Sequence, residues 1–484
     1  MDGSKIFKLV ILQFLALFIL SKAWAQTPES LHFEPLRFEP PEPRTVLLSN
    51  GIPVYLLENH ELPLITVDVL VKRGTLYEPP ELVGLFEIMV DVMRTGGTAT
   101  RSPRDVDEEL ESMAASVELS LGREYGIATL DMLAEDLPRG LDIFVDILRN
   151  PRFRDDRVAL RKQQAIEGIR RRNDNPSNIA FRLFPAYLYG KDHPLGASEE
   201  TSGIERITVA DLKEAHKALF HPENLVIAAS GDFDDRRIIP LLERHFGTWK
   251  PAAAPAAAGA AAMESLLEPS IYRGEPVVVY VEKDLNQSTL LMGHTSLKRT
   301  PENSDIFALR VMNEILGESS FTSRLFREVR DKRGLAYSVG SYFDTSSYTF
   351  PGYWVAFAQT RAEKTVETAS IMIDVIESMK ARPVGEEELQ VIKDSIVNSF
   401  VFSFESSSGV VRQRMILDVR GYPEDYLEQY TGRIAQVTSA DVLRVARRYL
   451  DLDHLIILVV GNDEFFEMPL HTLGTVLRVD PSEL

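Results

Sequence analysis

Cysteine is absent from this 484-residue chain. Its absence excludes disulfides, a thiol nucleophile, a cysteine-ligated metal and a lipidated cysteine anchor. Positive charge is also in short supply, because 53 Lys and Arg face 72 Asp and Glu, which gives a net charge of −19. Nucleic-acid binding requires clustered positive charge, so we expect no nucleic-acid partner.

Histidine is sparse as well. The chain has nine His, and none of them has the spacing of a zinc-binding helix motif. His216 and His221 lie five residues apart, which places them on different faces of a helix. We interpret both as structural.

Long apolar runs are missing beyond the N-terminus. There, Lys5 and Lys8 precede an apolar run at 9–20, and a small-x-small site ends at Ala25. This pattern predicts a secretory signal peptide at residues 1–25. An uncleaved anchor is the alternative, but a membrane span needs about 20 apolar residues. We therefore expect an exported protein without a stable membrane anchor, periplasmic if its source has two membranes.

Composition divides the rest of the chain. Residues 251–263, PAAAPAAAGAAAM, are rich in Ala and Pro and offer no polar helix face. Such a segment is typical of an interdomain linker. The sequence therefore predicts an N-terminal domain at 26–250, a linker at 251–270 and a C-terminal domain at 271–484.

The two halves repeat one another. LVIAASGD from Leu225 matches LIILVVGN from Leu455, and the same offset extends through the preceding helix start. Part of the match has a local cause, since Thr at the N-cap with Asp three residues later resembles a capping box. The constant offset across helix, strand and glycine predicts two duplicated α+β domains, each an antiparallel sheet with helices packed on it. The matching positions lie 230 residues apart: Thr208 and Thr438, Asp211 and Asp441, Gly231 and Gly461.

Hydrophobic periodicity places the elements in each half. We expect strands at 53–57, 65–72, 116–121, 127–132, 225–230, 277–281, 288–294, 337–343 and 353–358. We expect helices at 81–94, 103–112, 136–148, 155–173, 209–220, 306–316, 323–331, 365–379, 386–402 and from 440.

One stretch, SRLFREVRDKRGLAYSV at 323–339, is dense in arginine. A helix from Arg324 to Asp331 should stop at Gly334, with a strand beginning near Leu335. Arg330 and Tyr337 then lie seven positions apart across the helix stop. On residue types alone, a solvated basic helix followed by an ordinary strand tyrosine is the simpler interpretation.

This stretch, the duplicated halves and the Ala/Pro linker together resemble the pitrilysin/insulinase family of zinc metallopeptidases, over nearly the whole mature chain. Shorter stretches in the same order support the resemblance: LVGL at 82–85 followed by Gly97-Thr98, LRNPRF at 148–153 and FHPENL at 220–225. The resemblance implies a clam-like chamber of four homologous domains. In it, a peptide substrate adds as a strand to a sheet edge.

Enzymes of that family carry His-x-x-Glu-His on the helix after the first glycine, where two His bind zinc and the Glu activates water. Here the matching residues are Glu87, Val90 and Asp91, so both His positions are acidic and the base position is apolar. The third family ligand is a Glu, and the matching residue is Glu167. The resemblance thus implies that this chain binds no zinc itself.

Two interpretations of these acidic residues remain. Carboxylates at Glu87, Asp91 and Glu167 suit a hard cation such as calcium or magnesium better than zinc. Alternatively, Glu87, Asp91 and Arg94 at i, i+4 and i+7 form a polar helix stripe that pairs internally. We favour the stripe, because Val90 cannot act as a base even if a metal binds.

In family enzymes an Arg and a Tyr from the second half reach over the zinc site, and here they match Arg330 and Tyr337. The resemblance implies that the Tyr hydroxyl donates to the oxyanion, while the Arg fixes the substrate backbone and helps to hold that charge. Some members divide the zinc motif and the Arg/Tyr pair between two chains. This chain resembles the subunit without zinc, whose homologous zinc-motif partner forms a heterodimer or larger assembly with it.

Three hypotheses follow. The first is a subunit without zinc in an exported heteromeric peptidase, which supplies Arg330 and Tyr337 in trans. The second is a non-catalytic peptide-binding or scaffold protein of the same fold. The third is an enzyme that acts alone with a carboxylate-bound metal.

Overall fold

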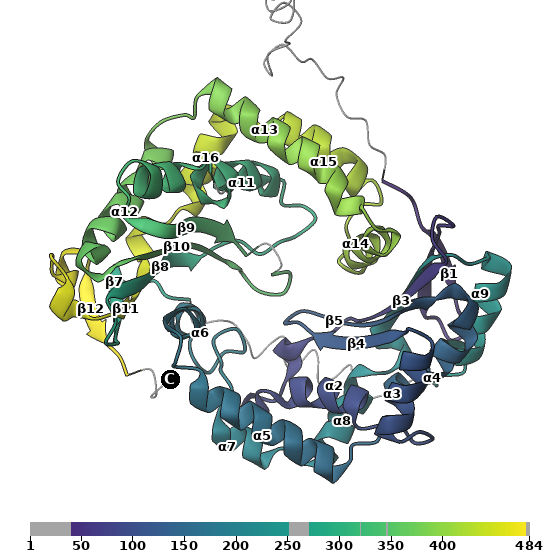
Figure 1. The fold of residues 1–484 in the computed structure, drawn as a ribbon. Helices are drawn as coiled ribbons and strands as arrows, with labels where there is room; N and C mark the ends of the chain where they lie inside the picture. The colour runs from purple at the N-terminus through teal and green to yellow at the C-terminus, as the bar shows by residue number, and fades with distance from the viewer. Residues whose placement is uncertain (1–39, 251–270, 320, 345–346, 481–484) are drawn as a thin grey trace, which may run out of the picture. The chain divides into compact units, whose positions relative to one another are not determined.

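A computed structural model describes residues 40–250, 271–319, 321–344 and 347–480. In the first half, β3, α2, β4 and β5 follow in order and position the residues discussed below (Figure 1). The elements of this half are β1 (Arg44–Leu47), β2 (Pro53–Glu58), β3 (Leu64–Val71), α2 (Leu85–Thr95), α3 (Pro103–Ser112), β4 (Ser116–Leu121), β5 (Gly126–Leu133), α4 (Leu137–Arg149), α5 (Asp155–Arg171), α6 (Pro176–Tyr189), α7 (Thr201–Arg206), α8 (Val209–Leu219), β6 (Leu225–Gly231) and α9 (Asp235–Leu242).

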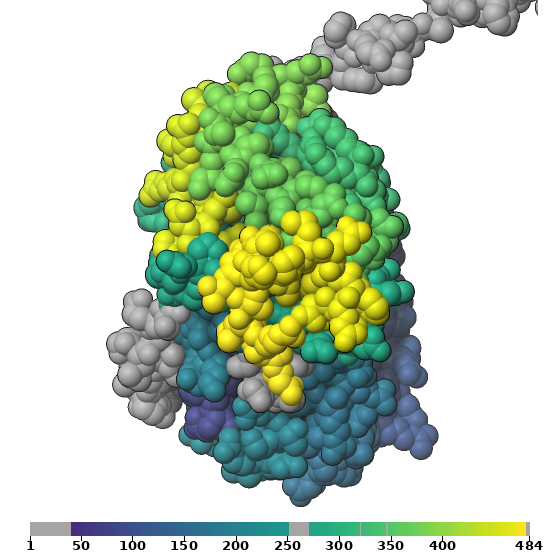
Figure 2. All heavy atoms as spheres, turned by 90° about the vertical axis from the view of Figure 1, so that its left-hand side faces the viewer, coloured from purple at the N-terminus to yellow at the C-terminus, as the bar shows by residue number. Residues whose placement is uncertain are grey.

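The second half repeats this order. A π-helical segment, η8 (Phe326–Asp331), stands before β9 (Ala336–Phe343), and the C-terminal residues after β11 lie at the surface of this half (yellow in Figure 2). Its other elements are β7 (Val277–Glu282), β8 (Gln287–Thr295), α11 (Asp305–Asn313), β10 (Tyr353–Arg361), α12 (Thr365–Ala381), α13 (Glu386–Phe400), α14 (Ser407–Val419), α15 (Tyr426–Ala435), α16 (Ser439–Tyr449), β11 (Ile456–Gly461) and β12 (Thr475–Arg478).

Each half contains one six-stranded sheet. The strand orders are β1-β2-β6-β3-β5-β4 and β12-β7-β11-β8-β10-β9, so five strands correspond one to one, and only the first edge strand of each sheet, β1 or β12, falls outside the repeat. This confirms the predicted duplicated α+β fold. The sheets are mixed rather than purely antiparallel, because β2 pairs in parallel with β6, and β7 with β11. The connections between these strands run through several helices, which allows parallel pairing.

The halves exchange one helix each. α6 from the first half packs on β8 and β11 of the second sheet, while α14 from the second half packs on β6 and β2 of the first. Leu183 and Phe184 share an apolar core with Leu291 of the second sheet. α6 and α14 also lie one repeat apart along the chain, since Arg182 and Arg412 are 230 residues apart. This reciprocal exchange makes the residues from Pro40 onward one compact unit.

Polar contacts reinforce the exchange. On α14, Arg412 Nη2 lies 2.7 Å from Oδ1 of Asp68, a carboxylate that is only 2% exposed on β3. Thr129 donates to the same Asp68 oxygen at 2.6 Å. Because a buried carboxylate without partners is strongly destabilising, this ion pair ties α14 to the first sheet.

The structure also differs from the sequence predictions in places. α6, α14 and α15 were not predicted, and the helix expected to end at 173 ends at Arg171. The predicted signal peptide at 1–25 and the linker at 251–270 lie outside the described residues. Within the described residues, no helix is long and apolar enough to cross a membrane.

Candidate functional site

Helix α2 carries the residues that replace the zinc motif. It starts at Gly84, whose φ of +96° favours glycine, and a Cβ there would meet Ile204 at 2.8 Å. Glu78 caps this start, because its carboxylate accepts hydrogen bonds from the backbone N–H groups of Phe86 (2.6 Å) and Gly84 (3.3 Å). Val90 is buried, so the position of the family base faces the apolar core.

The two acidic side chains of α2 are held by a cation from α5. Arg161 donates from Nη2 to Oε1 of Glu87, and its Nε lies 3.5 Å from Oδ2 of Asp91. The predicted internal pairing with Arg94 is wrong, since Arg94 instead binds Asp107 at 2.8 Å. One guanidinium thus pairs with both carboxylates across two helices, which leaves one negative charge uncompensated.

Glu167 does not join this group. It pairs with Arg171 at 2.9 Å and with Arg170 at 3.6 Å on its own helix. Six residues after Arg161, it points about 120° away from Arg161 around the helix. Gly168 instead follows Arg161 by seven residues, which places it on the face of Arg161. The structure therefore brings Glu87 and Asp91 together but leaves Glu167 apart.

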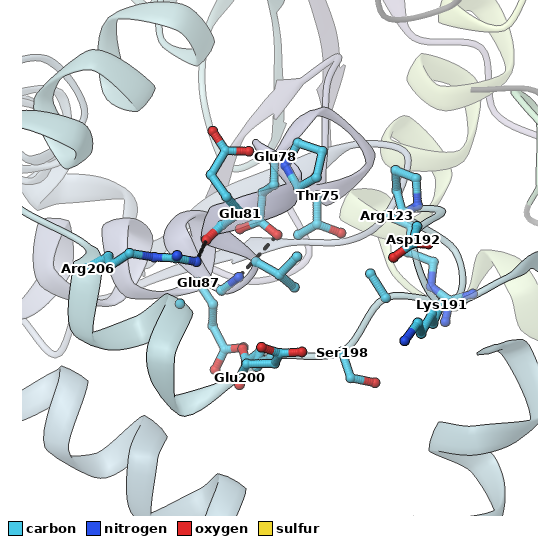
Figure 3. A pocket seen from close by; sticks show the side chains of 17 residues that line it. Thr75, Glu78, Glu81, Glu87, Arg123, Lys191, Asp192, Ser198, Glu200 and Arg206 are labelled. Atoms are coloured by element: carbon cyan, nitrogen blue, oxygen red, sulfur yellow. Dashed lines mark hydrogen bonds between the residues drawn. The ribbon is translucent and has the colours of Figure 1, made fainter. Parts of the chain in front are cut away.

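A cavity of about 370 Å³ lies beside the start of α2. In Figure 3, Glu87 and Glu200 lie close to one another, while Arg123, Lys191 and Asp192 gather on the opposite side. The cavity is lined on several sides by carboxylates from the β3–α2 connection, α2 and the loop before α7. Its acidic lining residues are Glu78, Glu81, Glu87, Asp192, Glu199 and Glu200.

Two of these carboxyls resist ionisation. Burial raises the pKa of Glu78 to about 7 despite its two backbone hydrogen bonds. Burial, with the charge of Glu87 nearby, raises the pKa of Glu199 to about 7. A side-chain hydrogen bond with Glu87 adds to this rise, because it favours the protonated form of Glu199. Sequence reasoning missed Arg161 and Glu199 because their contacts with α2 join segments far apart in the chain. It also missed Glu78, whose contacts lie only six and eight residues away but depend on the path of the loop before α2.

The donor set does not fit a zinc ion. A zinc site needs about four N, S or O ligands around one point, but the guanidinium of Arg161 binds both carboxylates of α2. Within the described residues, no three His, Cys, Asp or Glu side chains gather in a way that could hold a metal ion. His216 donates from Nε2 to the Leu148 carbonyl at 2.8 Å, and Nδ1 of His221 forms a hydrogen bond with Oε2 of Glu223 at 2.8 Å.

Arg330 and Tyr337 lie together in the second half. η8 ends before Gly334, whose φ is +61°, as the sequence predicted. Arg330 donates to the backbone carbonyl of Tyr337 at 3.0 Å, and its guanidinium lies 4.8 Å from the centroid of the Tyr337 ring. The Tyr337 side chain itself is 80% exposed, so its hydroxyl faces solvent.

Comparisons with known proteins agree with this picture. Residues 54–198 match the model of the insulinase family, peptidase family M16, and residues 206–396 match the model described as the peptidase M16 inactive domain. The chain is 27% identical to an uncharacterized zinc protease of Mycobacterium bovis, over 84% of this chain and 91% of that protein. It is 25% identical to the uncharacterized zinc protease YmxG of Bacillus subtilis, over 85% and 96%.

Solved structures share the fold. A peptidase M16 inactive domain from Pseudomonas fluorescens superposes with a TM-score of 0.77 at 23% identity, over 87% of this chain and 98% of that one. The periplasmic protease PqqL of Escherichia coli gives 0.74 at 16% identity, over 93% of this chain and 50% of that one. With both halves matched in order along one duplicated fold, the chain belongs to the insulinase (M16) peptidase family.

Proposed function

We propose that this chain is the subunit without zinc of an exported heteromeric metallopeptidase, and that it lends Arg330 and Tyr337 to the active site of a zinc-bearing partner. One observation carries the proposal. On α2, Glu87 and Asp91 stand at the positions of the family's two zinc-binding His and pair with Arg161, while Tyr337 remains exposed beside Arg330.

In this proposal the partner supplies the zinc and the base that activates water. Tyr337 donates a hydrogen bond from its hydroxyl to the oxyanion that forms when water attacks the scissile carbonyl. One preorganised donor of this kind contributes about 3–4 kcal/mol to lowering the barrier. This chain therefore needs no metal of its own to take part in catalysis.

The sheet edges offer a place for a peptide substrate. Among the described strands, β4 and β9 are each paired on one side only, so an extended peptide can add to either as a further strand. Tyr337 lies on β9 itself. Export of the subunit to the periplasm rests on the predicted signal peptide at 1–25 and is part of the same proposal.

The test is to co-express the chain with a homologous zinc-motif chain, and to measure cleavage of fluorogenic peptides. We expect activity only from the mixture, and a loss of about 100-fold or more in kcat for Tyr337→Phe. Tyr272→Phe, a change to a tyrosine that donates only to the nearby Glu275 carbonyl, is the matched control.

Two outcomes would contradict the proposal. Equal activity of the Tyr337→Phe mixture would show that the hydroxyl has no catalytic role. If the chain binds peptides but no mixture with a zinc-motif partner cleaves them, the chain is instead a peptide-binding or scaffold protein.

A further inference from the structure

We propose that Arg330 and Phe326 are positioning residues that fix the ring of Tyr337, and that the Tyr337 hydroxyl alone of the three meets the substrate. The inference rests on the proposed function and gives the residues of this site different roles in it. It assigns Arg330 a role toward Tyr337 instead of a direct contact with the substrate, and it adds Phe326, to which no role has been given so far.

The backbone of β9 is irregular at Tyr337. Along the pairing with β10, Gln359 faces Ser338 and Thr360 faces Ala336, so Tyr337 has no partner of its own. An extra residue of this kind forms a β-bulge, which bends the strand and redirects one side chain. The bulge explains how a large ring on a sheet edge comes to be 80% exposed between the buried Ala336 and the half-buried Ser338.

A ring that is this exposed has little packing to hold it. An ordered side chain loses rotamer entropy, and a tyrosine without contacts would sample several rotamers. A donor that stabilises an oxyanion must instead be held in place before the reaction. Some other contact must therefore fix the Tyr337 ring.

Arg330 supplies that contact twice. Its Nη1 donates to the carbonyl of Tyr337 at 3.0 Å, which restrains the bulged backbone. The same guanidinium lies 4.8 Å from the ring centroid of Tyr337 and 4.8 Å from that of Phe326. The cation therefore contacts both rings, and the Phe326 ring restrains its position.

The framework around this group is rigid. Phe326 is buried, and Phe321 packs edge-on against it with centroids 5.2 Å apart. The N–H of Gly334 bonds the Arg330 carbonyl at 2.8 Å, and that of Leu335 bonds the Val329 carbonyl at 3.0 Å. These bonds fix the end of η8 against the start of β9, so the distance from Arg330 to Tyr337 is set by the backbone.

Lysine cannot replace Arg330 in this role. An ammonium has neither the flat face that lies against aromatic rings nor a forked set of donors. Arg330→Lys keeps the charge for any substrate contact but loses the geometry that holds Tyr337. Phe326→Leu keeps the burial and removes the aromatic face.

The first measurement needs no partner. We would place 3-fluorotyrosine at position 337 of the full chain and record its 19F resonance. The wild-type resonance should differ from that of free fluorotyrosine, and it should move toward the free value in Arg330→Lys and in Phe326→Leu. Arg327→Lys is the matched control, because Arg327 binds Glu388 and not Tyr337.

The second measurement uses the complex with the zinc-bearing partner. Both variants should lower kcat about tenfold with little change in KM, since a misplaced donor weakens the transition state and not substrate binding. An unmoved 19F resonance in Arg330→Lys, with or without lost activity, would overturn the positioning role. A resonance that moves while the wild-type complex is inactive would support the positioning role and reject the proposed function.

Discussion

The helices α2 and α11 occupy equivalent places, since α2 follows β3 along the chain and α11 follows β8, and each of these strands is the fourth in its sheet. Their acidic residues nevertheless have different partners. On α11, Asp305 meets Arg444 at 2.7 Å, Arg448 at 3.2 Å and the Tyr449 hydroxyl at 2.9 Å. On α2 and in the cavity beside it, carboxylates outnumber the cations that contact them.

This difference distinguishes Asp305, an acid with a structural role, from the acids near α2, which lie where the family's zinc site would be. Two guanidiniums satisfy the single carboxylate of Asp305, so it stabilises the packing of α11 against α16. Near α2, Arg161 pairs with both Glu87 and Asp91, and burial raises the pKa of Glu199 to about 7 although Arg161 and Arg172 lower it in part. The packing of the duplicated fold is therefore kept in both halves. An excess of negative charge remains beside α2, where the enzymes of the family bind their metal.

Rebuilding the metal site would give the largest effect. The variant Glu87→His, Val90→Glu, Asp91→His, Gly168→Glu places zinc ligands on the facing sides of α2 and α5. A Cβ at Gly168 meets nothing within 4 Å, so the substitution causes no clash at the backbone. We expect zinc affinity to rise by about 100-fold or more only when Arg161→Ala is added, because the guanidinium repels the ion.

Zinc content after dialysis, together with competition by a chelator, measures this. Arg170→Ala on the same helix, in place of Arg161→Ala, is the control, since Arg170 pairs only with the remote Glu167. Tight zinc binding with Arg161 still present would show that this guanidinium does not exclude the metal.

The exchanged helices allow the next comparison. Arg412→Ala leaves Asp68 buried with Thr129 as its remaining neutral partner, and we expect a loss of about 3 kcal/mol in the free energy of unfolding. Arg104→Ala, which breaks the exposed ion pair with Glu108, should lower the free energy of unfolding by less than about 0.5 kcal/mol. Urea unfolding midpoints measure both, and equal losses would show that the buried pair contributes little.

The proton held by Glu199 predicts a pH dependence. Its folded pKa of about 7 lies above the unfolded value, so the folded state binds more protons and stability falls as pH rises through 7. Glu199→Gln should weaken that fall and stabilise the protein at pH 8 by about 1–2 kcal/mol. Thermal unfolding from pH 5 to 8 measures it, with the exposed Glu200→Gln as control. If the stability of Glu199→Gln depends on pH as strongly as that of the wild type, the raised pKa of Glu199 is not the cause of the pH dependence.

The smallest effect tests the repeat itself. Lys162 donates to the Ile207 carbonyl at 2.7 Å, and Lys393, 231 residues later, donates to the Val437 carbonyl at 3.0 Å. Lys162→Met and Lys393→Met should therefore each lower the free energy of unfolding by about 1 kcal/mol. Thermal unfolding of both variants checks this, and a large difference between them would show that the equivalence is only geometric.

Much of this architecture could be predicted from the sequence. The capping boxes at Thr208 and Thr438 and the strands that follow them are local signals, and they recur at one offset because both halves bury the same faces. The stop at Gly334 was predictable for a similar reason, since a left-handed residue after a basic turn is encoded locally. The replacement of the family's zinc ligands and base by Glu87, Asp91 and Val90 was also visible once the resemblance was recognised.

The sequence by itself therefore determined the duplicated fold, the altered zinc motif and the candidate pair of Arg330 and Tyr337. Only the tertiary structure decided that α6 and α14 each pack on the sheet of the other half, that Arg161 pairs with both carboxylates of α2, and that Arg330 lies against the Tyr337 ring. Periodicity and capping reflect interactions within a few residues, whereas these contacts join distant segments or depend on a bulge in strand pairing. Their partners are set by packing, which no local pattern records.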